Sequence, residues 1–166
     1  IQLKYTFKPN FKNQFNVIGL AAIDNFTLNP EANDGIDDPQ KLAQNEYTLN
    51  NLPVNEQWNY TLGGTWKRFF DNSNLFVVMS RSHLNNTAVK YEDYADLSSP
   101  KIIDYESQEI ENKSRIEYNF RENNIKFNVG LNLEDATYLN STQRILTSEE
   151  SIYTKLVETD LHFIKY

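Results

Sequence analysis

Residues 57–69 alternate between two kinds of side chain, and this alternation constrains the fold more than any other feature of the sequence. One alternate set is mostly large and apolar: Trp58, Tyr60, Leu62, Gly64 and Trp66. The other set is mostly polar: Gln57, Asn59, Thr61, Gly63, Thr65 and Lys67. Successive side chains of a β-strand point to opposite faces. The segment is therefore predicted to be a strand with one apolar and one polar face.

Similar patterns elsewhere predict an all-β chain. Seven strands are expected, at 1–8, 14–24, 56–69, 74–87, 106–120, 125–139 and 155–166. One face of 109–119 carries mainly charged residues: Glu109, Glu111, Lys113, Arg115, Glu117 and Asn119. In 14–24 and 74–84 both faces are mixed, so the sequence does not assign them.

The predicted connections alternate in length. The short ones fall at 9–13, 70–73 and 121–124, and the long ones at 25–55, 88–105 and 140–154. The long ones are rich in Asn, Ser, Pro and acidic residues. An antiparallel up-and-down meander with tight turns on one edge and long polar loops on the other is the plan of an outer-membrane β-barrel. We therefore expect residues 1–166 to form one partial barrel domain, with extracellular loops near 25–55, 88–105 and 140–154.

Aromatic residues gather at both ends of the predicted strands. The chain has ten Tyr, ten Phe and two Trp. The group near the short turns is Tyr5, Phe7, Phe11, Phe15, Trp66, Phe69, Phe70, Phe76, Tyr118, Phe120, Phe127, Phe163 and Tyr166; the group near the long loops is Phe26, Trp58, Tyr60, Tyr105, Tyr138 and Tyr153. Two such groups are expected where rings settle at the two membrane interfaces.

Seven strands raise the question of closure. Unpaired backbone groups cost several kcal/mol each in hydrocarbon, and bacterial barrels usually have an even number of strands. The sequence also opens on Ile1 without a signal-like stretch. We therefore expect a contiguous segment of a larger barrel.

Composition excludes several classes of function. The net charge of −7, from 23 acidic and 16 basic residues, argues against nucleic-acid binding, which normally shows a basic stripe. The absence of cysteine excludes disulfide scaffolds, thiol catalysis and cysteine zinc sites. The longest apolar run, at 17–23, is far shorter than the roughly 20 residues of a membrane-spanning helix.

Candidate chemical sites are weak. His83 and His162 lack a Gly-x-Ser-x-Gly nucleophile elbow. The pairs Glu149-Glu150 and Glu109/Glu111 fit a solvated charge run, and Asp34, Asp37 and Asp38 lack the spacing of an EF-hand. Asn-x-Ser/Thr triplets begin at Asn25, Asn59, Asn85, Asn112 and Asn140, which is near chance because the chain has 22 Asn. We expect no enzymatic activity, cofactor or metal, and the ligand-binding residues are unknown.

Several stretches resemble the barrel of TonB-dependent outer-membrane receptors. These are residues 22–26, 47–61, 66–73, 98–100, 104–113 and 126–131. The stretch 47–61 begins with Tyr47-Thr48-Leu49-Asn50-Asn51-Leu52-Pro53, and the stretch 66–73 begins with Trp66-Lys67-Arg68-Phe69-Phe70. The resemblance implies a 22-stranded barrel in the outer membrane, closed by an N-terminal plug. It also implies ligand uptake into the periplasm driven by the TonB complex. The implied partners are outer-membrane lipid, the remaining strands and plug of the parent chain, the TonB complex and a surface lipoprotein. No plug is present in this sequence, so no binding residue is transferred.

Two other functions remain open. One is a plug-less outer-membrane barrel, such as a porin, an adhesin or a secretion-associated barrel. The other is a soluble β-barrel or sandwich that binds carbohydrate, with Trp58 and Trp66 as stacking platforms. The mean hydropathy of −0.65 favours the soluble alternative, although alternating strands and polar loops also lower that average.

Overall fold

Residues 1–147 and 152–166 are described by a computed structural model. Seven strands of the described residues form one sheet: β1 (Gln2–Asn10), β2 (Asn13–Phe26), β3 (Val54–Phe69), β4 (Ser73–Tyr91), β5 (Lys101–Glu122), β6 (Ile125–Thr147) and β7 (Ile152–Lys165). Each strand pairs antiparallel with its neighbours in the sequence, in the order β1 to β7. The predicted all-β meander of seven strands is confirmed. Within the described residues the sheet is open, because β1 and β7 lie at opposite edges.

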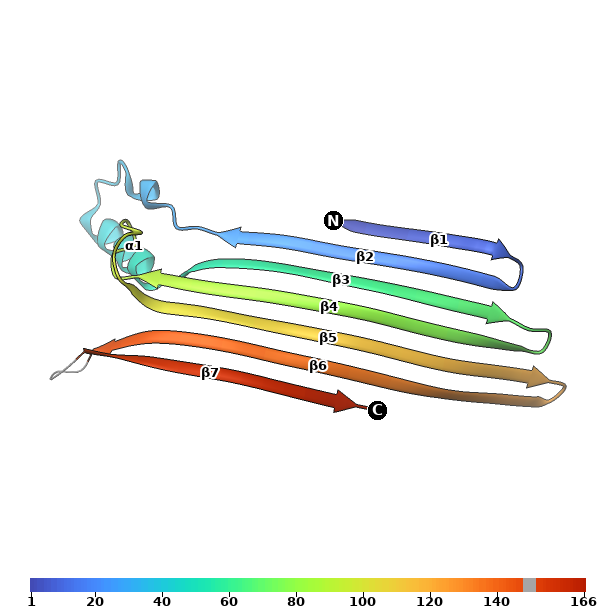
Figure 1. Ribbon diagram of the computed structural model, residues 1–166. Helices are drawn as coiled ribbons and strands as arrows, with labels where there is room; N and C mark the ends of the chain where they lie inside the picture. Colours follow the sequence, from blue (N-terminus) through green and yellow to red (C-terminus); the bar gives the residue numbers. More distant parts are fainter. Residues whose placement is uncertain (148–151) are drawn as a thin grey trace.

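The tight turns lie at one end of the strands, and the long connections lie at the other (Figure 1). In the β1–β2 turn, the side-chain oxygen of Asn10 accepts a hydrogen bond of 3.0 Å from the backbone N–H of Lys12. In the β5–β6 turn, Asn123 has a φ of 50°, a left-handed conformation that Asn tolerates better than most residues. Asn residues therefore shape both turns by local chemistry.

The strands extend further toward the long connections than the sequence predicted. β4 runs to Tyr91 and β5 begins at Lys101, so residues 92–100 alone connect them rather than 88–105. β6 likewise continues to Thr147, and β7 begins at Ile152. Pairing such as Val89 with Asp104 continues where each face mixes polar and apolar residues. The sequence pattern missed these ends because alternation requires one apolar face. The rest of the predicted 140–154 loop lies outside the described residues.

The connection 27–53 contains two helices that the sequence analysis did not predict. A short 3-10 helix, η1, spans Pro30–Asn33, and α1 spans Pro39–Asn51. Asp38 caps α1 by accepting a hydrogen bond of 2.9 Å from the backbone N–H of Gln40. Pro39 suits the first helical position because its missing N–H would have no partner there. No helix of the described residues is long and apolar enough to cross a membrane.

The sheet is one layer thick and has no hydrophobic core of its own (Figure 1). In the described part of the chain no hydrophobic side chain is buried, and the buried residues are Asn85 and Ser107. Hydrophobic burial is the dominant favourable term in folding. The apolar side chains of this sheet must therefore be covered by something other than the described residues.

Candidate functional site

The strand register sorts the side chains onto two faces. Residues directly opposite each other in a sheet share a face. One continuous row across five strands is Val17, Gly64, Met79, Ser114 and Leu133. We call the side that carries this row the apolar face, and the other side the polar face. The register also assigns β2 and β4, which the sequence left open: Val17 and Met79 place their odd-numbered residues on the apolar face.

Large hydrophobic side chains on the apolar face are exposed. Leu62 is 56% exposed, Met79 64% and Leu131 63%. The same face includes Leu3, Tyr5, Phe7, Val17, Ile116, Val129 and Leu133, which are also exposed. Folded proteins rarely leave a contiguous apolar surface of this extent in water, and such surfaces mark contact with membranes or with other proteins.

We call the exposed hydrophobic side chains of the apolar face near the tight turns the apolar band. On β4 to β7 this band ends at a row of polar residues. We call it the polar row: Tyr60, Arg81, Asn112, Asp135 and His162. Arg81 donates from Nε to the Tyr60 hydroxyl at 3.2 Å and from Nη1 to Asn112 Oδ1 at 2.9 Å. Asn112 Nδ2 donates to Asp135 Oδ2 at 3.1 Å, and the other carboxylate oxygen contacts His162 Nε2. The row therefore links β3 to β7 through side chains alone.

The polar row separates two zones of the apolar face. Toward the tight turns lie Leu75, Val77 and Met79 on β4. Toward the long connections lie His83 and Asn85, whose side chains contact Gln108 at 3.2 Å and Glu106 at 3.1 Å. The change occurs within one step of the alternation, between Met79 and Arg81. A boundary of this kind on β4 is expected where the surroundings of the sheet change from apolar to aqueous, although on β5 and β6 the apolar residues Ile110 and Leu139 lie beyond the row.

Aromatic rings on the apolar face form two groups, one on each side of the apolar band. Near the tight turns, Phe15 stacks on Trp66 with ring centroids 6.2 Å apart, and Phe7 lies 6.4 Å from Phe15. At the polar row, Trp58 stacks on Tyr60 at 6.3 Å. The His83 ring meets the Trp58 ring edge-on at 4.8 Å.

Part of the predicted aromatic pattern is wrong. Tyr105 is paired with Ala88, and Tyr138 with Glu109, which places both on the polar face. Phe69 and Phe76 also lie on the polar face, since they follow the parity of Lys67 and Ser80. The register places Phe26, Tyr153 and Phe163 on that face as well, and Phe163 pairs with Ala136 in the middle of the sheet, not near the tight turns. The prediction sorted rings by their position along each strand. It did not use the parity of each ring within its strand, which decides the face on which the ring lies.

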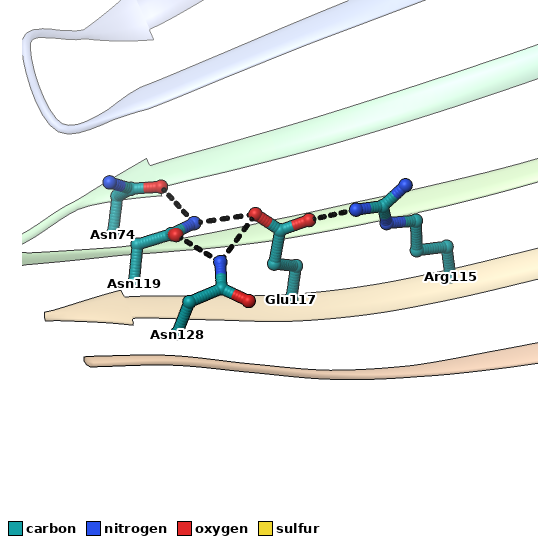
Figure 2. A network of polar contacts seen from close by, with 5 residues as sticks. All are labelled: Asn74, Arg115, Glu117, Asn119 and Asn128. Atoms are coloured by element: carbon teal, nitrogen blue, oxygen red, sulfur yellow. Dashed lines mark hydrogen bonds and ion pairs between the residues drawn. The ribbon is translucent and has the colours of Figure 1, made fainter.

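The polar face carries a network of amides and charges near the tight turns. Figure 2 shows Asn119 donating to Asn74 at 3.4 Å and to Glu117 at 3.0 Å, and Asn128 donating to Glu117 at 2.9 Å. Arg115 forms an ion pair with the other oxygen of Glu117. The network spans β4 to β6, so every strand in this part of the sheet contributes a polar group.

Ion pairs continue along the same face. Lys113 Nζ lies 2.8 Å from Glu111 and 3.5 Å from Glu134. The charged set predicted for one face of 109–119 is confirmed to share one face, together with Asn59, Thr61, Asn128, Asn132 and Glu134. Side chains of this kind need water or polar partners. On β3 to β6 the polar face is therefore suited to an aqueous space, whereas on β2 and β7 the same face also exposes Ile18, Leu20, Leu161 and Phe163.

The remaining candidates form no chemical site in the described residues. His83 and His162 are both on the apolar face but in separate contacts, with Gln108 and Asp135. Asp38 caps α1, and no group of three or more His, Asp or Glu side chains in the described part of the chain could hold a metal ion. Glu149 and Glu150 lie outside the described residues.

Comparison with known proteins finds no family model, no curated protein and no solved structure that matches this chain.

Proposed function

We propose that the chain is part of an outer-membrane β-barrel of the TonB-dependent transporter type, which binds a ligand outside the cell and passes it into the periplasm. The observation that carries the membrane part of the proposal is the apolar face. It is exposed, it is flanked by two aromatic groups, and on β4 to β7 it ends at the polar row. Lipid hydrocarbon is the environment that covers such a face without a second protein layer.

The dimensions support a bilayer. On β6 the apolar band runs from Ile125 to Leu133, which is eight steps, or about 26 Å at ~3.3 Å per residue. A strand tilt of about 40° reduces this to about 20 Å along the membrane normal, close to the apolar band of about 25 Å in known barrels. β6 has 23 residues, so its remaining length projects beyond the band on the side of α1.

The polar face is the proposed lumenal face. Its ion pairs and amide network would contact water or a plug inside the barrel, where charges remain solvated. The open edges of β1 and β7 would pair with the remaining strands of the parent protein. The coupling to TonB is supported by the sequence resemblance.

Site-directed spin labelling of the full-length protein in lipid bilayers tests the membrane part of the proposal. We expect labels at Leu62 and Met79 to be accessible to oxygen dissolved in the lipid, and labels at Thr61 and Ser80 to an aqueous nickel reagent. A label at Asp160, on the apolar face beyond the polar row, is the control and should contact water. Labels at 62 and 79 that neither reagent reaches would indicate a covering protein layer and contradict the proposal.

The transporter part needs a separate test. A pull-down of the full-length protein with the purified periplasmic domain of TonB should recover a complex. Failure to recover it, together with lipid-accessible labels at 62 and 79, would favour a plug-less barrel.

A further inference from the structure

The apolar face has a shallow hollow directly beside the polar row. Its volume is about 580 Å³, and its lining includes Gly64, Met79, Ser114, Leu133 and Arg81. The hollow exists because Gly64 and Ser114 flank Met79 in one cross-strand row and lack the bulk of the surrounding side chains. It therefore offers an apolar floor with the guanidinium of Arg81 and the carboxylate of Asp135 at its edge.

Arg81 is held by uncharged acceptors, and the carboxylate of Asp135 interacts with it electrostatically without a direct ion pair. The Arg81 side chain is held by the Tyr60 hydroxyl at 3.2 Å and by the amide oxygen of Asn112 at 2.9 Å, and both acceptors are uncharged. Arg81 forms no ion pair with any carboxylate of the described residues, and its side chain is exposed. The nearby Asp135 is instead engaged by Asn112 and His162. A fixed guanidinium with donors to spare suits a phosphate group.

On the basis of the proposed function, we propose that this hollow binds one anionic, phosphate-bearing membrane lipid. One acyl chain lies over Gly64, Met79 and Ser114, and the phosphate accepts hydrogen bonds from Arg81. In such a lipid the charged phosphate lies next to the beginning of the acyl chain. In the hollow, the charged Arg81 likewise lies next to the apolar Met79, so the two parts of the lipid and the two parts of the site match. Arg68, the other arginine of the apolar face, lies near the tight turns instead, with its guanidinium 5.2 Å from the centre of the Phe70 ring.

The test uses the full-length protein in nanodiscs of phosphatidylcholine doped with phosphatidylglycerol, followed by native mass spectrometry of the retained lipids. We expect wild-type protein to prefer phosphatidylglycerol about five-fold, the effect of one cationic side chain at a membrane surface. Arg81→Gln should remove the preference, because glutamine keeps a polar amide beside Tyr60 but carries no charge.

Two further variants separate the parts of the site. Arg144→Gln removes the same charge from the polar face and should leave the preference unchanged. Ser114→Leu fills the hollow with an apolar side chain that suits a lipid-facing strand, and it should reduce the number of retained lipids while the protein still inserts.

Equal binding of both lipids by wild type, or an unchanged preference in Arg81→Gln, would overturn the proposal. Undiminished retention in Ser114→Leu would overturn the role of the hollow. Spin labels at 62 and 79 in the same samples distinguish this failure from that of the proposed function. If the labels stay accessible to lipid, the barrel proposal stands without the lipid site.

Discussion

Val77 lies inside the apolar band of β4, with Trp66 and Ile116 as its cross-strand partners. A charge placed there would face hydrocarbon in the proposed barrel. We expect Val77→Arg to lower the free energy of unfolding of the full-length protein in lipid vesicles by about 2–4 kcal/mol, as measured by urea titration.

Ser82→Arg is the matched control. Ser82 lies on the polar face of the same strand, opposite Glu111, so the new arginine meets an aqueous space and an opposite charge. We expect a change within about 0.5 kcal/mol. Equal destabilisation by both substitutions would contradict the assignment of the two faces.

Asp96 lies in the connection 92–100, where its carboxylate accepts hydrogen bonds from the Ser98 hydroxyl at 2.6 Å and the Ser98 backbone N–H at 2.9 Å. These bonds lower the pKa of Asp96 below its ordinary value. A lowered pKa in the folded state stabilises the loop above the ordinary carboxyl pKa. This contribution is lost as the pH falls through the lowered value.

Replacing Ser98 tests this loop contact. We expect Ser98→Ala to raise the pKa of Asp96 toward its ordinary value, because the hydroxyl bond is the larger of the two causes. Carbon-detected NMR titration of labelled aspartates would measure it. Ser98→Thr keeps a hydroxyl and should preserve the lowered pKa, and an unshifted pKa in Ser98→Ala would refute the contact.

At the scale of elements, α1 depends on its first turn. Asp38 accepts hydrogen bonds from the backbone N–H groups of Gln40 and Lys41, at 2.9 and 3.5 Å. Losing an N-cap of this kind costs about 1 kcal/mol. We expect Asp38→Ala to speed hydrogen exchange of the α1 amides about five-fold, whereas Asp37→Ala, one residue earlier, should leave it unchanged. Equal exchange in the two variants would exclude the cap.

The pairing of β5 and β6 is close at Gly130. A Cβ atom at this position would lie 3.1 Å from the backbone oxygen of Ile116, which is tighter than ordinary contacts. At Gly64 a Cβ atom would have ordinary contacts, with the backbone oxygen of Asn16 at 3.9 Å. We expect Gly130→Ala to destabilise the protein by about 1 kcal/mol. Gly64→Ala should be neutral, and thermal unfolding of the two variants side by side would show whether this ordering is correct.

The elements differ in how far sequence alone could define them. Strand β3 was predictable because large apolar or aromatic side chains occupy alternate positions from Trp58 through Tyr60 and Leu62. The outer ends of β5 and β6 were not, since residues such as Asp104 and Gln143 are polar on a face that is apolar elsewhere. The helix α1 had a local signal in Asp38-Pro39, but its weakly amphipathic sequence gave no clear period.

The polar row shows that sequence-based prediction has a similar limit at the candidate site. Arg81, Asn112 and Asp135 are 23 or more residues apart in sequence, and the row exists only through the register of β4, β5 and β6. The mixed faces of 74–84 hid the side on which Arg81 lies. Alternation predicts that a face exists, but the register is needed to show which side chains meet across strands.

At the scale of the whole molecule, the two open edges of the sheet determine how it can associate with other strands. β1 and β7 each present one side without a strand partner in the described residues. Exposed strand edges template pairing with other chains. We expect residues 1–166 expressed alone to aggregate or oligomerise, as measured by light scattering. In the proposed barrel the amides of β1 and β7 should exchange slowly, because strands of the parent protein would pair with both edges. Rapid exchange of both strands in the full-length protein would contradict barrel closure.

The connectivity of the meander also bears on how the sheet is assembled. Each tight turn joins two strands that can zip together from the turn outward, so hairpins β1–β2, β3–β4 and β5–β6 are natural early units. Joining the first two units requires closure of the 27-residue stretch 27–53, whereas the next junction closes over the nine residues 92–100. Loop-closure entropy rises with length. The encounter of β2 with β3 therefore carries the larger closure cost of these two junctions.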